Sequence, residues 1–267
     1  MNKTDKLHIA SWSGGKDSTA TIILAHINNE PLDLILISLV WFDKERKIYG
    51  ERPETIAWIF GYAKPLFESW GYKVEIISSE KDYLHFFHKI RQKSKYPEYV
   101  GKKYGFLLGG MCKMNPEKVE PIKKYLKALN ADYVEYVGIA IDEPSRLERL
   151  NSKDGEISLL EKYGYNQADT RALWDKYNLL APYYKISRRG GCWFCPNQGI
   201  PELADLKIKH PELYNELLKL SGEENTIQRG FKYGIPFEEI NAQVDSYINN
   251  PPPKQLTLFD YIEEANL

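Results

Sequence analysis

The chain has 267 residues, of which 43% are hydrophobic and 13% aromatic, and its formal net charge is −1. This length and composition are typical of a soluble globular protein with one large domain or two small ones. The longest apolar run, Leu34 to Phe42, falls short of the ~20 residues that cross a bilayer, so we expect no membrane association. The first ten residues lack the apolar segment of a signal peptide, which predicts a cytoplasmic location.

Strand-like and helix-like segments alternate along the first part of the chain. The apolar patterns predict strands over 6–12, 32–42, 72–78 and 132–141, and helices over 17–29, 53–71 and 116–130. The second helix is expected to close at Gly71. Such alternation predicts an α/β fold, with a parallel sheet covered by helices on both faces and ligands at the carboxyl ends of its strands.

The pattern changes at about Asp142, where charged helical pieces, a turn rich in glycine and cysteine, and a polar helical tail follow. We therefore expect three parts. They are an α/β domain over 1–141, a smaller helical region with the C-x-x-C turn over 142–250, and a proline-led tail over 251–267. No internal repeat is visible.

The loop between the first expected strand and the first expected helix reads SGGKDST, from Ser13 to Thr19. A strand, a tight glycine turn and a helix place consecutive backbone N–H groups and a helix N-terminus around one anion. Glycines allow close backbone approach, the hydroxyls of Ser13, Ser18 and Thr19 donate hydrogen bonds, and Lys16 adds positive charge. The sequence therefore predicts a phosphate-binding loop, although the G-x-x-x-x-G-K-[ST] spacing of the Walker type is not met.

The six residues SGGKDS resemble, letter for letter, the signature of the PP-loop ATP pyrophosphatases. The resemblance implies an adenine-nucleotide α-hydrolase-like sheet in the domain over 1–141. It also implies an enzyme that uses ATP and Mg²⁺, cleaves between the α and β phosphates and adenylylates its substrate. By this resemblance Lys16 and Asp17 handle charge and metal, and the leaving pyrophosphate is held by Ser13, Gly14, Gly15 and Ser18. Asp43, after the second expected strand, either faces the nucleotide or is a solvated loop residue.

Three further segments resemble the phosphoadenylylsulfate (PAPS) reductase-like branch of that superfamily: CKMNPEKVEPIKKYL, GIAIDEPSRLERL and RRGGCWFCPNQ. Glu143 and Arg146 match the branch pattern and are expected at the nucleotide, whereas Ala140 stands where an arginine is usual. No cysteine follows Cys195, and the tandem Cys-Cys of iron–sulfur adenylylsulfate reductases is missing. The chain is therefore expected not to be a true PAPS reductase, and it resembles instead the DNA phosphorothioation sulfur-transfer proteins.

The sequence holds three cysteines, Cys112, Cys192 and Cys195. The C-x-x-C spacing of the last two is typical of ligands to one metal or cluster, and related proteins also supply a cysteine in the segment of Cys112. Three thiolates suit a [4Fe–4S] cluster with one open iron. The alternatives are a Zn²⁺ site completed by His85, His88 or His210, and unligated buried thiols.

Two segments suggest macromolecular partners. From Lys81 to Tyr104, lysines and arginines interleave with phenylalanines and tyrosines, which suits DNA or tRNA, or equally a helix with a solvated basic face. In the tail, Gln255 to Phe259 read QLTLF and resemble the pentapeptide that binds the bacterial sliding clamp. The alternative is that these apolar residues pack on the body of the protein.

Taken together, these patterns predict ATP-dependent adenylylation of a nucleic acid or nucleotide, followed by transfer of sulfur, or less favourably nitrogen. A sulfur donor protein is then an expected partner. One alternative is a small-molecule enzyme that uses PAPS. A second, from another class, is a zinc-stabilised module that senses a nucleotide without turnover.

Overall fold

The computed structural model describes residues 6–107, 112, 114–187, 190–227 and 230–251. The chain divides into two compact units. The first comprises Met1–Ile90 and Gly110–Phe194, and the second comprises Arg91–Gly109 and Cys195–Leu267. Residues 142–194 therefore belong with the first unit, whereas the change of sequence pattern suggested a boundary at 141.

A five-stranded sheet forms the centre of the first unit. Its strand order is β5-β2-β1-β6-β7, and every neighbouring pair is parallel. The strands are β1 Leu7–Trp12, β2 Leu34–Leu39, β5 Lys73–Ser78, β6 Tyr133–Tyr136 and β7 Glu156–Ile157. The predicted parallel sheet is confirmed, and the sequence patterns missed only β7, which has two residues.

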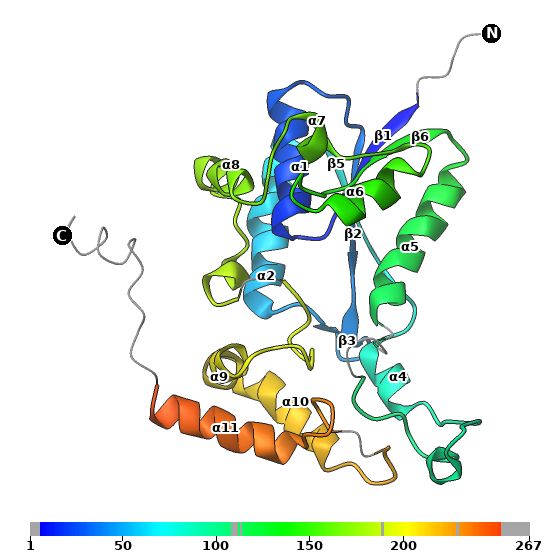
Figure 1. The fold of residues 1–267 in the computed structure, drawn as a ribbon, viewed down its shortest axis with the longest axis vertical. Coiled ribbons are helices and arrows are strands. Elements are labelled where there is room, and N and C mark those ends of the chain that lie inside the picture. The colour runs from blue at the N-terminus through cyan, green and yellow to red at the C-terminus, as the bar shows by residue number, and fades with distance from the viewer. Residues whose placement is uncertain (1–5, 108–111, 113, 188–189, 228–229, 252–267) are drawn as a thin grey trace, which may run out of the picture. The chain divides into compact units, whose positions relative to one another are not determined.

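Alternate residues of the central strands enter two separate cores, because successive side chains of a strand point to opposite faces. In β1, Ile9 joins Leu34, Leu36 and Leu126 on one face of the sheet. On the other face, Ala10 and Trp12 join a larger core. Figure 1 shows α5 on one side of the strands and α1, α2 and α8 on the other. The expectation of helices on both faces is confirmed.

The helices of the first unit follow the predicted segments closely, with additions at α4 and after β6. The prediction of one helix over 53–71 is met by α2 Pro53–Trp58, a π-helical turn over Ile59–Ala63 and α3 Lys64–Ser69, after which Gly71 has a φ of +95°. The others are α1 Lys16–Ile27, α4 Tyr83–His88, α5 Met114–Leu129, α6 Pro144–Asn151, α7 Leu159–Lys162, α8 Asp169–Tyr177 and a 3₁₀ turn over Pro182–Lys185. None of the helices in the described ranges is long and apolar enough to cross a bilayer.

The single strand predicted over 32–42 is instead divided. After β2 the chain leaves the sheet and forms a small antiparallel hairpin of β3 Trp41–Asp43 and β4 Ile48–Tyr49. Trp41 and Tyr49 stack across it with ring centroids 4.0 Å apart. The segment around Trp193 is fastened to this hairpin, because Trp193 donates from its backbone to the Gly50 carbonyl and from its indole to the Tyr49 carbonyl, each at 2.9 Å.

The second unit is mainly helical. It contains α9 Ile200–Lys209, α10 Pro211–Ser221, α11 Phe237–Asn249 and a 3₁₀ turn over Pro97–Tyr99. Phe237 lies at its centre, with the rings of Phe106, Tyr214 and Phe231 at centroid distances of 5.0 to 6.1 Å. Residues 103 and 225–227 join the two chain segments of this unit through backbone hydrogen bonds.

Candidate functional site

The glycine loop connects β1 to α1 in the way that the sequence predicts. Gly14 has a φ of +70°, a backbone conformation that favours glycine. A side chain at Gly15 would place its Cβ 2.9 Å from the Ser13 hydroxyl. The loop is therefore shaped by the two glycines, and the N-terminus of the twelve-residue helix α1 follows directly after it.

Two hydroxyls of the loop lie within hydrogen-bonding distance of each other. Ser13 Oγ and Ser18 Oγ lie 3.0 Å apart, and Ser18 Oγ also accepts from the Ser13 backbone N–H at 3.1 Å. Thr19 differs, because it is only 1% exposed and its hydroxyl accepts from the Trp12 indole at 3.0 Å. Thr19 therefore faces the core and holds the end of β1 against α1.

A cavity of about 340 Å³ lies over this loop. Its walls come from several regions of the first unit: the loop, the β4–α2 connection and α2, α5, the segment after β6 with α6, the 3₁₀ turn over Pro182–Lys185, and the glycines before Cys192. The residues that line it include Ser13 to Ser18, Glu51, Thr55, Lys118, Gly138, Arg146, Tyr183, Tyr184, Gly190 and Gly191. The cavity thus lies at the carboxyl ends of β1 and β6, where a parallel sheet places its ligands.

Asp17 is the carboxylate of the loop. Its Oδ1 is buried and has no hydrogen-bond partner among the described residues. Burial raises the pKa of Asp17 above its ordinary value, Lys16 and Arg146 act in the opposite direction, and Glu143 and Asp142 raise it further. A buried carboxylate oxygen without a partner fits a hard cation such as Mg²⁺, which takes one or two protein carboxylates and completes its shell with phosphates and water.

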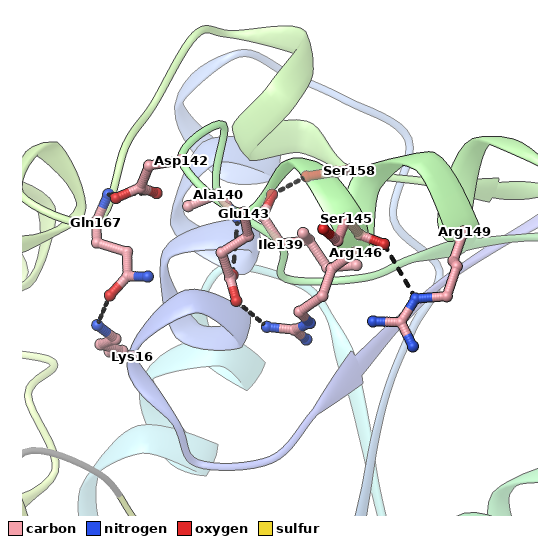
Figure 2. A network of polar contacts seen from close by, with 10 residues as sticks. All are labelled: Lys16, Ile139, Ala140, Asp142, Glu143, Ser145, Arg146, Arg149, Ser158 and Gln167. Atoms are coloured by element: carbon pink, nitrogen blue, oxygen red, sulfur yellow. Dashed lines mark hydrogen bonds and ion pairs between the residues drawn. The ribbon is translucent and has the colours of Figure 1, made fainter.

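Glu143 and Arg146 form an ion pair at the start of α6. Arg146 Nη1 lies 2.5 Å from Glu143 Oε2, and the Ala140 N–H donates to the other carboxylate oxygen at 3.4 Å. Figure 2 shows the two side chains turned toward each other beside the loop. Arg146 lines the cavity, and the charges of both residues influence Asp17. These two predicted residues are therefore brought to the loop.

The side chain of Lys16 is held by a residue outside the loop. Its ammonium donates to Gln167 Oε1 at 2.5 Å, and the Gln167 N–H donates to the Asp142 carboxylate. In Figure 2 the side chains of Lys16 and Gln167 meet end to end. The backbone of Lys16 is also fixed, since its N–H donates to the Tyr184 hydroxyl and its carbonyl accepts from the Trp174 indole, both at 3.2 Å.

Asp43 is not among the described residues that line the cavity. It ends β3, is 8% exposed, and accepts from the Arg46 guanidinium at 2.5 Å and from the Arg46 backbone at 3.0 Å. Burial raises its pKa, but the hydrogen bonds from Arg46 outweigh that effect and hold the pKa of Asp43 below its ordinary value. In the structure the Asp43 carboxylate therefore accepts hydrogen bonds within the turn that follows β3.

Sequence reasoning missed an ion pair in the cavity wall. Lys118 Nζ on α5 lies 2.7 Å from Glu51 Oε1, and both residues line the cavity. Glu51 is 9% exposed, and its second oxygen has no hydrogen-bond partner among the described residues. Burial lowers the pKa of Lys118, but the negative charges of Glu51, Cys192 and Cys112 raise it above its ordinary value.

Gly138 was also missed, although it lies in a segment singled out by resemblance. A Cβ at this position would lie 2.5 Å from the Ser18 backbone nitrogen and 2.6 Å from the Asp17 carbonyl carbon. The segment after β6 therefore approaches the first turn of α1 as closely as a backbone without a side chain permits. The signal for such a glycine is its place inside the run over 132–141 that predicted a strand, because a glycine within a strand often marks a close approach of another backbone.

The three cysteines occupy different surroundings. Cys192 is buried and Cys112 half-buried in the first unit, and the charges of both act on Lys118. Cys195 belongs to the second unit, where its carbonyl accepts from the Gln198 N–H. Within the described ranges, no three His, Cys, Asp or Glu side chains lie together as metal ligands would. The three-cysteine site, with iron–sulfur or zinc, therefore stays a prediction.

The basic, aromatic segment from Lys81 to Tyr104 is part of both units. Phe86 and Phe87 are buried, so these two rings belong to a core. Lys103 pairs with Glu223 at 2.8 Å, while Lys95 and Tyr96 are exposed. Nucleic-acid binding by this segment stays a prediction, as does clamp binding by Gln255 to Phe259, which lie outside the described residues.

Comparison with known proteins leaves the chain without an assigned family. No protein-family model matches the sequence, and no curated protein matches it. The α/β class is established by the parallel sheet itself.

Proposed function

We propose that this protein is an ATP pyrophosphatase of the PP-loop kind. In this proposal it cleaves ATP between the α and β phosphates and adenylylates an oxygen of a nucleic acid or nucleotide, from which a sulfur nucleophile then displaces AMP. The observation that carries the proposal is the cavity at the carboxyl end of β1. There the SGGKDS loop, the cations Lys118 and Arg146, and the acidic residues Asp17 and Glu51 line one space. Each of the two acidic residues has a buried oxygen without a hydrogen-bond partner among the described residues.

The loop would bind the pyrophosphate portion of ATP. The hydroxyls of Ser13 and Ser18 are close enough to donate to the same phosphate, and the N-terminus of α1 attracts negative charge. Gly14 and Gly15 leave the backbone bare, which permits a phosphate to approach. Lys118 and Arg146 would face the charge that grows on the leaving pyrophosphate.

Asp17 and Glu51 would hold the magnesium ion. Each has one buried oxygen without a partner among the described residues, and both residues line the cavity. Bound Mg²⁺ would neutralise charge on the phosphates and so ease breakage of the bond between the α and β phosphorus atoms.

Exchange of labelled pyrophosphate into ATP tests the adenylylation step. Because adenylylation is reversible until AMP is displaced, we expect exchange that depends on Mg²⁺ and rises when an acceptor is added. Ser13→Ala should reduce the exchange rate by about 100-fold, as loss of one donor to a developing anion does. Ser221→Ala is the matched control, because that hydroxyl donates to the Leu218 carbonyl within α10 of the second unit. Equal exchange in the two variants contradicts the proposed role of the loop.

A further inference from the structure

A second cavity of the first unit, of about 760 Å³, shares two lining residues with the loop cavity. These are Lys16 and Tyr184, so the two spaces meet at the first residue of α1. The second cavity extends from there along α8 and the 3₁₀ turn over Pro182–Lys185. It is the larger of the two, and the proposed binding of ATP does not use it.

The charge of the second cavity is of one sign. Lys16, Arg171 and Lys185 line it, and no carboxylate is among the described residues that do so. Beside it, the Asp142 carboxylate accepts from the Gln167 N–H. A concave surface with three cations concentrates the field and attracts an anion. The ligand of this cavity is therefore expected to carry phosphates or other negative groups.

Hydrogen bonds and ring packing fix the residues between the two cavities. The Trp174 and Tyr184 rings lie nearly parallel with centroids 6.4 Å apart. The Trp174 indole donates to the Lys16 carbonyl, and the Tyr184 hydroxyl accepts from the Lys16 N–H. The ammonium of Lys16 is held by Gln167, which itself lines the second cavity. Lys16 is thus positioned at the boundary, where a group bound in one cavity would meet a group bound in the other.

Apolar and aromatic surface accompanies the cations. Leu180, Tyr184 and Ile186 are half-buried and line the same cavity. Alternation of cations with apolar and aromatic groups is the pattern that binds single nucleic-acid strands, because cations take the phosphates and rings take the bases. A base oxygen is buried within the stack of a duplex, whereas a base of a single strand can enter a concave site.

We infer that this second cavity binds the acceptor as a single nucleic-acid strand. Its phosphodiesters lie on Arg171 and Lys185, and the oxygen to be adenylylated is directed past Lys16 toward the α-phosphate of ATP. The inference rests on the proposed function and names its substrate class. It assigns to α8 and the Pro182–Lys185 turn a binding role that the sequence motifs did not indicate.

Strand binding without turnover tests the inference. The full-length protein is titrated into a fluorescent single-stranded oligonucleotide of about 12 nucleotides, at several salt concentrations. The test variant is Arg171→Gln with Lys185→Gln. The matched control is Lys127→Gln with Lys176→Gln, which removes the same charge from exposed positions of the first unit outside the described lining of the cavity.

The test variant should bind the strand about tenfold more weakly, and the slope of log affinity against log salt should shrink by about 1 to 2. The control should bind as the unmodified protein does, and affinity for a non-hydrolysable ATP analogue should be equal in all three. Equal loss in the test and control variants overturns the inference. Loss of ATP affinity in the test variant alone also overturns it, because the cavity would then serve the nucleotide.

A competitor separates a strand from a small acceptor. We expect unlabelled strand to displace the probe at far lower nucleotide concentration than a mononucleotide does. Equal competition would overturn the strand assignment in favour of a small phosphorylated acceptor. Failure of the proposed function is distinguishable, because it appears as absence of pyrophosphate exchange in the unmodified protein while strand binding still depends on Arg171 and Lys185.

Discussion

At the scale of single residues, Asp17 lies in the proposed ATP site, but its burial is unfavourable for the charged carboxylate. Burial raises its pKa, so the folded protein binds a proton at this site more readily than the unfolded chain does. Stability from this site is then fully present below the ordinary pKa of 3.8 and is lost as the pH rises through the raised value. The charged carboxylate therefore destabilises the folded protein at neutral pH.

Replacement of Asp17 by asparagine should separate the two effects. We expect Asp17→Asn to melt at a higher temperature than the unmodified protein at pH 7, with the difference vanishing as the pH falls toward 3.8. Pyrophosphate release should fall by about 100-fold or more. Asp154→Asn, at an exposed position, is the control and should change neither quantity. A lower melting temperature for Asp17→Asn at pH 7 would refute the account of this carboxylate.

Gly138 gives a second test at the residue scale. Because a Cβ there would meet the backbone of Asp17 and Ser18 at 2.5 to 2.8 Å, Gly138→Ala must displace the first turn of α1. We expect a loss of about 1 to 3 kcal/mol in the free energy of unfolding, measured by urea denaturation, together with weaker ATP binding. Gly61→Ala is the control, since a Cβ there meets no atom within 4 Å. Similar behaviour of the two variants would show that the close approach at Gly138 is unimportant.

At the scale of elements, the Glu51–Lys118 pair joins the β4–α2 connection to α5 in the cavity wall. Lys118→Met leaves the Glu51 carboxylate buried without its cation. We expect this change to lower the free energy of unfolding by about 1 to 2 kcal/mol, a value reduced because a third of the lysine side chain is exposed. Adding Glu51→Gln should recover much of that loss.

A double-mutant cycle measures this coupling directly. Additive losses from Glu51→Gln and Lys118→Met would mean that the two side chains do not interact in solution. We expect the double variant to regain stability but not pyrophosphate exchange, because the proposed function requires both charges at the phosphates.

The elements also show how far sequence patterns reach. Apolar runs and the SGGKDS loop located β1, α1, β2, β5 and α5, since burial on a parallel sheet imposes a local signal. The run over 32–42 predicted one strand, but the chain turns out of the sheet after Leu39 to pair Trp41 with Tyr49. The run over 132–141 stops as a strand at Tyr136, two residues before the close approach at Gly138.

The sequence could not predict which side chains pair when they are far apart along the chain. Glu51 and Lys118 are 67 positions apart, and Lys16 and Gln167 are 151 positions apart. Nothing local in either pair marks the other as a neighbour, because such contacts follow from the order of strands and the placement of helices. The residues of the loop could be predicted because they are consecutive in the sequence, so the motif alone indicates the turn and the helix N-terminus that they form.

At the scale of the whole molecule, the cysteine prediction reaches from the first unit to the second. If Cys112, Cys192 and Cys195 share an iron–sulfur cluster, replacing any one by alanine should remove the same chromophore and the same iron and sulfide content from anaerobically purified protein. Zinc in place of iron would favour the alternative metal. Metal-free protein with three titratable thiols would contradict both.

The central claim is the bond at which ATP breaks, and the identity of the products decides it. The purified protein is incubated with ATP, Mg²⁺ and a single-stranded nucleic acid, and the nucleotides and phosphates are separated by anion-exchange chromatography. The account predicts AMP and pyrophosphate in equal amounts, with both lost in Ser13→Ala. Formation of ADP and inorganic phosphate would contradict it, because the loop would then release the γ-phosphate and the acceptor could not be adenylylated.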